Sequence, residues 1–267
     1  MILAVDLGGT SLRLGLSSAG AASPWLAEHR CSRPEPLTTE ALTTILREAL
    51  AAWGFRSADL AGCGVSVAAV VDRGRVVRRA ENLGWYDVPL AGKLEAVLGC
   101  PVRIDTDVFC GALYEVRHGL ARNTSAALYV AVGTGVGHAL ILGGRVWRGS
   151  TGAANAIGHA PVIPDGRSCY CGHTGCLCTV ASGRAGDLGY AHLDPLARAL
   201  AFAVTLIEPD RIVLSGGALA QPWFDLARLR VRLADLAYPT ARLAEIAVSA
   251  APDPNLRGAA CLFEEKA

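Results

Sequence analysis

Two glycine-rich turns, one in each half of the chain, constrain the fold more than any other feature. In the first, the apolar residues 2–5 lead into Asp6-Leu7-Gly8-Gly9-Thr10, and alternating apolar residues follow at 12–16. In the second, the apolar segment 127–141 encloses Gly133-Thr134-Gly135-Val136-Gly137. Each pattern predicts a β-hairpin with a glycine-rich turn. The recurrence suggests two related domains, although two hairpins alone are weak support for a repeat.

Both turns have the composition of a phosphate-binding loop. Glycine lets backbone N–H groups approach phosphate oxygens, and the Thr10 hydroxyl can add a donor. Asp6, at a strand end, is placed to hold Mg²⁺ through water. An ordinary glycine hairpin is the alternative for either turn alone, whereas two hairpins facing across a cleft can hold the phosphates of ATP. A third segment, 212–217, has strand–glycine–helix form, and its Gly216 and Gly217 suit an adenine or ribose lying on backbone.

The remaining pattern alternates strands with helices. We expect helices over 37–53, 88–98, 107–118 and 193–207, and strands over 62–71, 102–104 and 211–214. Thr38 or Thr39 is the expected cap of the first helix and Asp87 that of the second, with Pro89 in its first turn. The expected domains are α/β units over 1–107 and 108–252, with a C-terminal helix at about 253–267 packing back on the first.

Composition excludes several classes of function. The 267 residues are 52% hydrophobic and 18% charged, with a net charge of +1 and no basic block. A nucleic acid or a membrane surface is therefore not expected as the main partner. The start reaches Asp6 too early for a signal peptide, so a cytoplasmic location is expected. The most apolar stretch, 126–144, carries Thr134, His138 and several glycines, which favours two strands over a membrane span.

Four of the nine cysteines fall between Cys169 and Cys178. An odd count concentrated in this way does not suit a disulfide framework. Three thiolates and one imidazole, from Cys169, Cys171, Cys176 and His159, would satisfy a tetrahedral Zn²⁺ with no open position, which is typical of a structural site. A group of free cysteines is the alternative.

These elements, in this order, resemble the ROK family (repressors, open reading frames and sugar kinases) within the actin-like ATPase fold. The matching stretches are residues 5–10, 82–85, 133–137, 152–159, 169–176 and 212–217. The resemblance implies two actin-like α/β domains with a ligand cleft between them. It also implies ATP, Mg²⁺ and Zn²⁺ as cofactors, a small sugar or polyol as substrate, and a homodimer. Because the chain begins at the first phosphate strand, the repressor branch with its winged-helix segment is not expected.

The resemblance also assigns individual roles. Asp107 matches the family's catalytic base, which accepts the proton of the attacking hydroxyl. A helix N-cap is the alternative role for this aspartate. His159 matches the histidine that binds zinc through one ring nitrogen and the sugar through the other, so zinc would orient an acceptor contact. Asn82 is expected to line the acceptor pocket.

The departures from the family pattern all fall on the acceptor side. Ala68-Ala69 replaces Pro-Gly, Thr106 replaces the Asn before the base, Ala156 replaces a Glu, and Cys178 replaces a second sugar-binding Glu. A buried hydroxyl without its partner costs about 1–3 kcal/mol, so glucose should bind poorly. We therefore expect a non-glucose sugar or a cyclitol as acceptor. For Cys178 a packed thiol is expected, with an extra zinc ligand as the alternative.

A small-molecule kinase is thus the leading interpretation, with a non-catalytic nucleotide- or sugar-binding sensor as its main rival. The altered acceptor positions favour the sensor, whereas the retained Asp107 and both glycine turns favour the kinase. A DNA-binding regulator would need a DNA-binding segment or a basic face that the sequence lacks.

Overall fold

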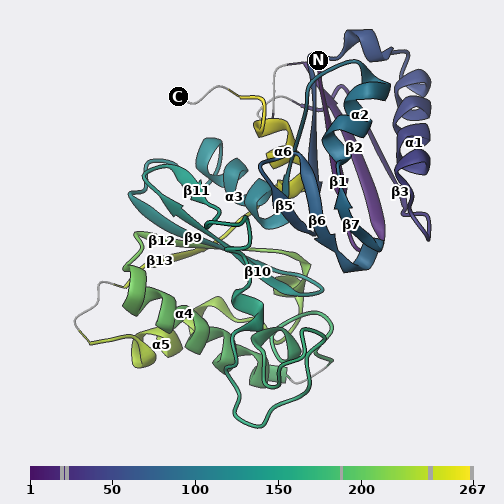
Figure 1. The fold of residues 1–267 in the computed structure, drawn as a ribbon. Helices are drawn as coiled ribbons and strands as arrows, with labels where there is room; N and C mark the ends of the chain where they lie inside the picture. The colour runs from purple at the N-terminus through teal and green to yellow at the C-terminus, as the bar shows by residue number, and fades with distance from the viewer. Residues whose placement is uncertain (19–20, 22–23, 187–188, 240–242, 265–267) are drawn as a thin grey trace. The chain divides into compact units, whose positions relative to one another are not determined.

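The computed structural model describes residues 1–18, 21, 24–186, 189–239 and 243–264. The chain divides into two compact units (Figure 1). The first comprises Met1–Gly119, Gly149–Ala153 and Ala251–Ala267, and the second comprises Leu120–Arg148 and Ala154–Ala250. The division after residue 119 differs from the expected one after residue 107, because helix α3 (Asp107–Arg117) packs against α6 (Pro254–Cys261) within the first unit.

The first unit is built on a five-stranded sheet with the order β3-β2-β1-β4-β8. These strands are β1 (Ile2–Leu7), β2 (Ser11–Ser17), β3 (Ala27–Ser32), β4 (Gly62–Val67) and β8 (Val102–Thr106). Strands β1, β2 and β3 pair antiparallel, and β1, β4 and β8 pair parallel. The predicted first hairpin is therefore confirmed. The expected strand 62–71 is divided, because its end forms β5 (Val70–Asp72) in a small sheet with β6 (Val76–Ala80) and β7 (Trp85–Val88).

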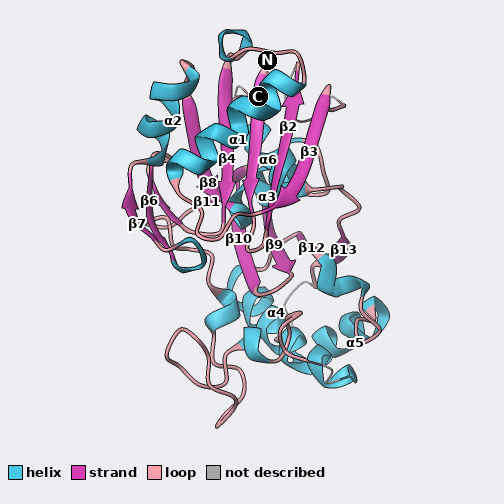
Figure 2. Cartoon of the chain, turned by 90° about the vertical axis from the view of Figure 1, so that its right-hand side faces the viewer, coloured by secondary structure: helices cyan, strands magenta, loops and turns pink. Residues whose placement is uncertain are grey.

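Helices cover both faces of this sheet (Figure 2). Side chains alternate along β1, so Leu3, Val5 and Leu7 pack in one cluster with α1 (Thr39–Ala52) and α2 (Leu90–Leu98). Ala4 points the other way and packs with α3 and α6. The hydrophobic residues predicted for the first two helices thus form the larger core of the unit.

The two predicted helix caps have different outcomes. Thr38 caps α1, because its hydroxyl accepts a hydrogen bond from the N–H of Ala41 at 3.1 Å. Asp87 does not cap α2, whose N-cap is Pro89. The Asp87 backbone has a positive φ of 52°, and its carboxylate pairs with Arg78 at 2.9 Å. That ion pair on the neighbouring strand competes with the capping role.

The second unit repeats the same sheet. Its order is β11-β10-β9-β12-β13, from β9 (Ala126–Val132), β10 (Val136–Leu142), β11 (Arg145–Trp147), β12 (Arg211–Ser215) and β13 (Glu245–Val248). The first three pair antiparallel, and β9, β12 and β13 pair parallel. Each sheet therefore combines a hairpin and its edge strand with two parallel strands, which supports the duplication suggested by the glycine turns.

The second core lies between this sheet and two helices, α4 (Leu193–Ile207) and α5 (Leu226–Leu236). The helix expected directly after Gly217 is only a 3₁₀ turn (Gly217–Ala220). Further 3₁₀ turns are Ser57–Asp59, Glu81–Leu83, Ile157–His159, Leu177–Thr179 and Gly189–His192. The apolar stretch 126–144 forms two strands, as predicted, and none of the described helices has the length and apolar character needed to span a membrane.

Helix α6 approaches its neighbours closely because glycines face it and lie within it. A Cβ added at Gly258 would lie 1.8 Å from the carbonyl oxygen of Cys110 on α3. A Cβ at Gly64 of β4 would lie 1.9 Å from the carbonyl oxygen of Ala259. Backbone cannot move as a side chain can, so hydrogen at these positions allows the C-terminal helix to complete the first unit.

We expect Gly258→Ala to destabilise the first unit by about 3 kcal/mol, because the added methyl group forces α6 away from α3. The control is Gly92→Ala, since Gly92 lies on the exposed side of α2 and has open space around its Cβ position. That change should stabilise the helix by about 0.5–1 kcal/mol. Urea unfolding of both variants measures the effect, and equal unfolding midpoints would contradict this account of α6.

Candidate functional site

In the first unit, polar side chains form a row across the sheet near the strand ends. Asp6 of β1 is in register with Ser66 of β4, which is in register with Asp105 of β8. Asp6 is only 2% exposed, and the Ser66 hydroxyl donates a 2.7 Å hydrogen bond to its Oδ1. Burial raises the pKa of Asp6, whereas the Ser66 bond and the Arg13 guanidinium oppose that rise. Asp6 is thus a desolvated carboxylate, held in one orientation.

Arg13 connects Asp6 to the start of the C-terminal helix. Its Nε lies 3.7 Å from Asp6 Oδ2, and its Nη1 pairs with the carboxylate of Asp253. Asp253 is the N-cap residue of α6 and has a positive φ of 46°. Because it lies beside one carboxylate and is paired with another, Arg13 offsets part of the negative charge at this strand end.

The tip of the first glycine turn is exposed, and hydrogen bonds to its backbone hold the turn in place. Gly8 N–H donates to the carbonyl of Ser11 at 2.9 Å, and the guanidinium of buried Arg33 donates twice to the carbonyl of Gly9, at 3.0 and 2.8 Å. In the described ranges, the N–H groups of Gly9 and Thr10 have no protein acceptor. They are therefore available to bind an anion, and the Thr10 side chain lies on the same exposed turn.

Asp107 begins α3, directly after β8. The N-cap is Thr106, so Asp107 is the first helical residue rather than the cap, and its Oδ1 accepts the N–H of Val108 at 2.8 Å. Burial raises the pKa of Asp107 to about 7, and the charge of Asp6 adds to the rise. A carboxylate that titrates near neutral pH can take up a proton from a reacting hydroxyl.

Two of the predicted acceptor positions are joined by a hydrogen bond. Buried Thr106 donates its hydroxyl to the carbonyl of Ala69 at 2.7 Å, which joins the end of β8 to the turn before β5. Asn82 lies on the exposed 3₁₀ turn Glu81–Leu83. None of the described hydrogen bonds connects it to Thr106 or Ala69.

In the second unit, the two predicted nucleotide elements are neighbours. Gly133, Thr134 and Gly135 form the turn between β9 and β10, and Gly137 of β10 pairs with Ala131 of β9. Gly216 follows β12 with a φ of 109°, and a Cβ there would lie 2.4 Å from the carbonyl oxygen of Val132. This close approach, which only glycine permits, places Gly216 and Gly217 beside the end of β9 that leads into the turn.

The four predicted zinc ligands converge in the second unit. His159 Nδ1 and the Sγ atoms of Cys169, Cys171 and Cys176 all lie within 4.8 Å of one another. His159 Nδ1 is 3.5 Å from Cys169 Sγ, and Cys171 Sγ is 3.6 Å from Cys176 Sγ. Zn–S and Zn–N bonds of about 2.3 and 2.0 Å give tetrahedron edges of about 3.5–3.8 Å. These four residues therefore fit a tetrahedral zinc ion.

The other ring nitrogen of His159 also has a partner. The hydroxyl of Tyr170 lies 3.0 Å from His159 Nε2, and the two rings meet edge to face at 5.0 Å. Tyr170 is 73% exposed and lies between two of the cysteines. Ala156 directly precedes the 3₁₀ turn that carries His159, and Cys178 Sγ lies 3.5 Å from Cys169 Sγ.

The cysteine cluster (His159, Cys169, Cys171 and Cys176) is connected to the second glycine turn through the segment that follows it. Ser182 donates its hydroxyl to the carbonyl of Cys178 at 2.7 Å, and the next residue, Gly183, donates its N–H to the carbonyl of Gly133 at 2.7 Å. The turn itself is closed by the N–H of Gly133 donating to Gly135 at 2.9 Å. A well-ordered cysteine loop therefore helps to hold the Gly133 turn in position.

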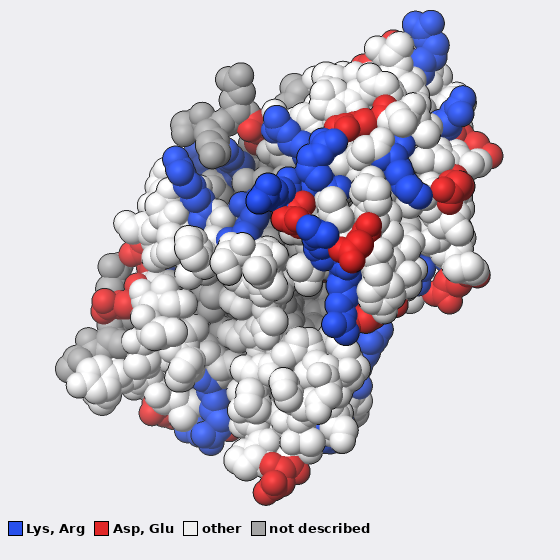
Figure 3. All heavy atoms as spheres, viewed as in Figure 1, with Lys and Arg blue, Asp and Glu red and all other residues white. Residues whose placement is uncertain are grey.

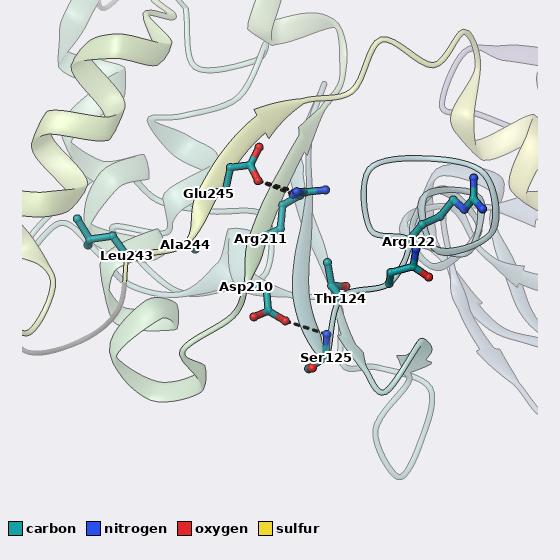
Figure 4. Close-up of a pocket in the computed structure, with 9 residues that line it drawn as sticks. Arg122, Thr124, Ser125, Asp210, Arg211, Leu243, Ala244 and Glu245 are labelled. Carbon is teal, nitrogen blue, oxygen red and sulfur yellow. Dashed lines mark hydrogen bonds and ion pairs between the residues drawn. The ribbon is translucent and has the colours of Figure 1, made fainter.

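A polar pocket lies at the opposite end of the second sheet. Asp210 accepts the N–H of Ser125 at 2.8 Å, and Arg211 pairs with Glu245 at 2.6 Å (Figure 4). It contains none of the predicted site residues. Arg211 and Glu245 pair with each other, and Asp210 accepts backbone N–H groups. The pocket lies at the amino ends of the parallel strands, whereas ligands of such sheets bind beyond the carboxyl ends. On the face drawn in Figure 3, acidic and basic side chains are interspersed.

Sequence reasoning missed Ser66, Arg13, Asp253, Arg33 and Tyr170. Ser66 could have been found, because a polar residue at the end of a buried parallel strand meets the end of its neighbour. Arg33 and Asp253 carry no such signal. They reach the site through a loop and through the return of the chain to the first unit, and these are long-range contacts.

Comparison with known proteins shows the family of the chain. Residues 2–192 match the model of the ROK family. A glucokinase of Halalkalibacterium halodurans is 35% identical over 67% of this chain and 55% of its own length, and a putative xylose repressor of Caldicellulosiruptor is 34% identical over 69% and 47%. The chain thus spans about half the length of these relatives.

Solved structures give the fold. The ROK family glucokinase of Streptomyces griseus, solved with glucose and AMPPNP, superposes with a TM-score of 0.82 at 25% identity over 98% of both chains. The predicted fold class, two actin-like α/β domains, is confirmed. The chain belongs to the ROK family.

Proposed function

We propose that this protein transfers the γ-phosphoryl group of ATP to a hydroxyl of a small sugar or polyol. The observation that carries the proposal is the pair of carboxylates at the ends of β1 and β8, beside an anchored glycine turn with free N–H groups. The glucokinase relatives of the chain support the same reaction class.

Each group has a role in the proposed reaction. Asp107 takes the proton of the acceptor hydroxyl as that oxygen bonds to the γ-phosphorus and the bond to the bridging oxygen breaks, which releases ADP. The N–H groups of Gly9 and Thr10 in the first turn, and of Thr134 and Gly135 in the second, donate to phosphate oxygens, whereas the N–H groups of Gly8 and Gly133 close their own turns. Gly216 and Gly217 lie against the nucleoside. Mg²⁺, held by Asp6 through water, would neutralise charge on the phosphates.

Structural zinc is the second part of the proposal. His159, Cys169, Cys171 and Cys176 would hold it, and the tetrahedral spacing of their donor atoms supports this assignment. The ion would fix a loop that has little other regular structure, and it would orient the His159 ring.

The acceptor is proposed to be a sugar or cyclitol other than glucose. The support is the loss of two carboxylates at Ala156 and Cys178, which removes acceptors for ring hydroxyls. In addition, the Thr106 hydroxyl is already bonded to Ala69 and is not free to bind a substrate in the way the expected asparagine would.

A non-catalytic sensor is the second candidate. It is favoured by the xylose-repressor relatives and by Tyr170, which covers the Nε2 atom of His159.

Asp107→Asn should lower kcat by about 10³-fold, because the amide cannot accept the hydroxyl proton, and should leave nucleotide affinity nearly unchanged. In the wild type, kcat should rise with pH through about 7, where Asp107 loses its proton. Coupled ADP-release assays and nucleotide titration measure the two effects. Nucleotide binding without turnover on any acceptor would favour the sensor instead.

Asp107→Asn also tests the raised pKa of Asp107 through its effect on the free energy of unfolding. The pKa of about 7 in the folded state exceeds the ordinary value of 3.8, so the folded wild type binds the extra proton between these pH values. Asp107→Asn should therefore gain stability relative to wild type as pH rises from 4 to 7, by up to about 4 kcal/mol, with no further gain above 7. Urea unfolding across this pH range measures it, with exposed Asp235→Asn as control. A difference independent of pH would contradict the raised pKa.

An acceptor screen with MgATP tests specificity. We expect kcat/KM for glucose and for N-acetylmannosamine to lie about 100-fold below that for the best sugar or cyclitol, because the pocket lacks two carboxylates. Replacing both positions, as Ala156→Glu with Cys178→Glu, should raise kcat/KM for glucose. Turnover of glucose by the wild type at ordinary hexokinase efficiency would refute this preference.

A further inference from the structure

A fifth soft donor lies against the zinc cluster. Cys178 Sγ is 3.5 Å from Cys169 Sγ and 3.8 Å from His159 Nδ1. Together with the 3.5 Å between Cys169 Sγ and His159 Nδ1, these distances form a triangle. Its edges have the length of a zinc tetrahedron's edges, about 3.5–3.8 Å. Cys178 Sγ thus lies at the spacing of a ligand from two of the donors, Cys169 Sγ and His159 Nδ1, although it is outside the set of four whose donor atoms all lie within 4.8 Å of one another.

The backbone holds this thiol in place. Cys178 belongs to the 3₁₀ turn Leu177–Thr179, which begins directly after the ligand Cys176. The N–H of Leu177 donates to the carbonyl of Ala160, the residue after His159, at 3.0 Å. The Cys178 carbonyl accepts the Ser182 hydroxyl at 2.7 Å. With Cys178 only 8% exposed, the contacts of its sulfur are set by the fold.

We propose that Cys178 is a reserve zinc ligand that replaces His159 and converts a three-cysteine, one-histidine site into a four-cysteine site. Structural zinc is four-coordinate, so a fifth donor acts by exchange and not by addition. In the exchange His159 leaves as a neutral imidazole, and the Cys178 thiol releases its proton to solvent as it binds. No oxidant or reductant takes part. The proposal rests on the zinc site proposed above.

His159 has two proposed roles, binding zinc and contacting the acceptor, and the exchange allows it to perform them separately. With His159 as an obligatory ligand, the cysteine loop keeps its metal only while the ring keeps one orientation. With Cys178 in reserve, the loop stays closed when His159 turns away from the cysteines toward an acceptor. Through Ser182 and Gly183, the same loop also keeps hold of the Gly133 turn. A residue that replaces a sugar-binding carboxylate in the family pattern thereby serves the metal.

Zinc affinity across a set of variants tests the proposal. His159→Ala should keep one zinc per chain and lose less than about tenfold in affinity, because Cys178 completes the site, whereas His159→Ala with Cys178→Ser should lose more than about 100-fold. His159→Ala with Cys31→Ser is the matched control and should behave like His159→Ala, since Cys31 lies on β3 in the other unit. Competition with a chromogenic chelator gives each affinity.

X-ray absorption at the zinc edge counts the sulfur ligands independently of activity. We expect three in the wild type and four in His159→Ala. Should His159→Ala not fold, His159→Asn serves in its place, with the same expected count of four. If His159→Ala loses zinc as completely as the double variant, or shows three sulfurs and an oxygen, the reserve role is overturned while the zinc site stands. Absence of zinc from the wild type overturns both.

Discussion

The first unit depends on two desolvated carboxylates, buried Asp6 near the end of β1 and half-buried Asp107 directly after β8. Asp6 lies near the end of β1, which has sheet neighbours on both sides. Asp107 begins α3, the helix that directly follows β8. Removing a carboxylate from water is costly, so its ionised form persists only where dipoles or cations compensate. Ser66 and Arg13 provide this compensation for Asp6. Burial raises the pKa of Asp107 to about 7, and the charge of Asp6 adds to that rise.

The second unit depends on a different kind of constraint. Its loop of residues 160–186 contains little regular secondary structure, yet it carries four of the five donors of the cysteine cluster and reaches the Gly133 turn. Such a loop gains order from a few strong bonds at fixed points rather than from an apolar core. The donor spacing provides those points, and Ser182 and Gly183 transmit the position of the cluster to the turn.

The two units show how one sheet topology can serve two purposes. Both have a glycine turn at the same place in the hairpin, but the first surrounds it with charged groups and the second with backbone carbonyls and a tight glycine contact at Gly216. The changes from the family pattern at Ala69, Thr106, Ala156 and Cys178 leave both frameworks intact. They alter instead the polar groups that would meet an acceptor.

The sequence by itself determined the local features: both hairpins, the Thr38 cap, the main helices and the four side chains that converge in the cysteine cluster. These follow from spacing within short stretches, where apolar periodicity, glycine and cysteine act on near neighbours. Tertiary structure alone decided the rest. It paired Asp87 with Arg78 instead of capping α2, placed α3 with α6 in the first unit, and brought Arg33 and Asp253 to the first glycine turn and Asp6. It also set Cys178 beside His159. Contacts between residues distant along the chain depend on how whole elements pack, and local sequence patterns do not predict that packing.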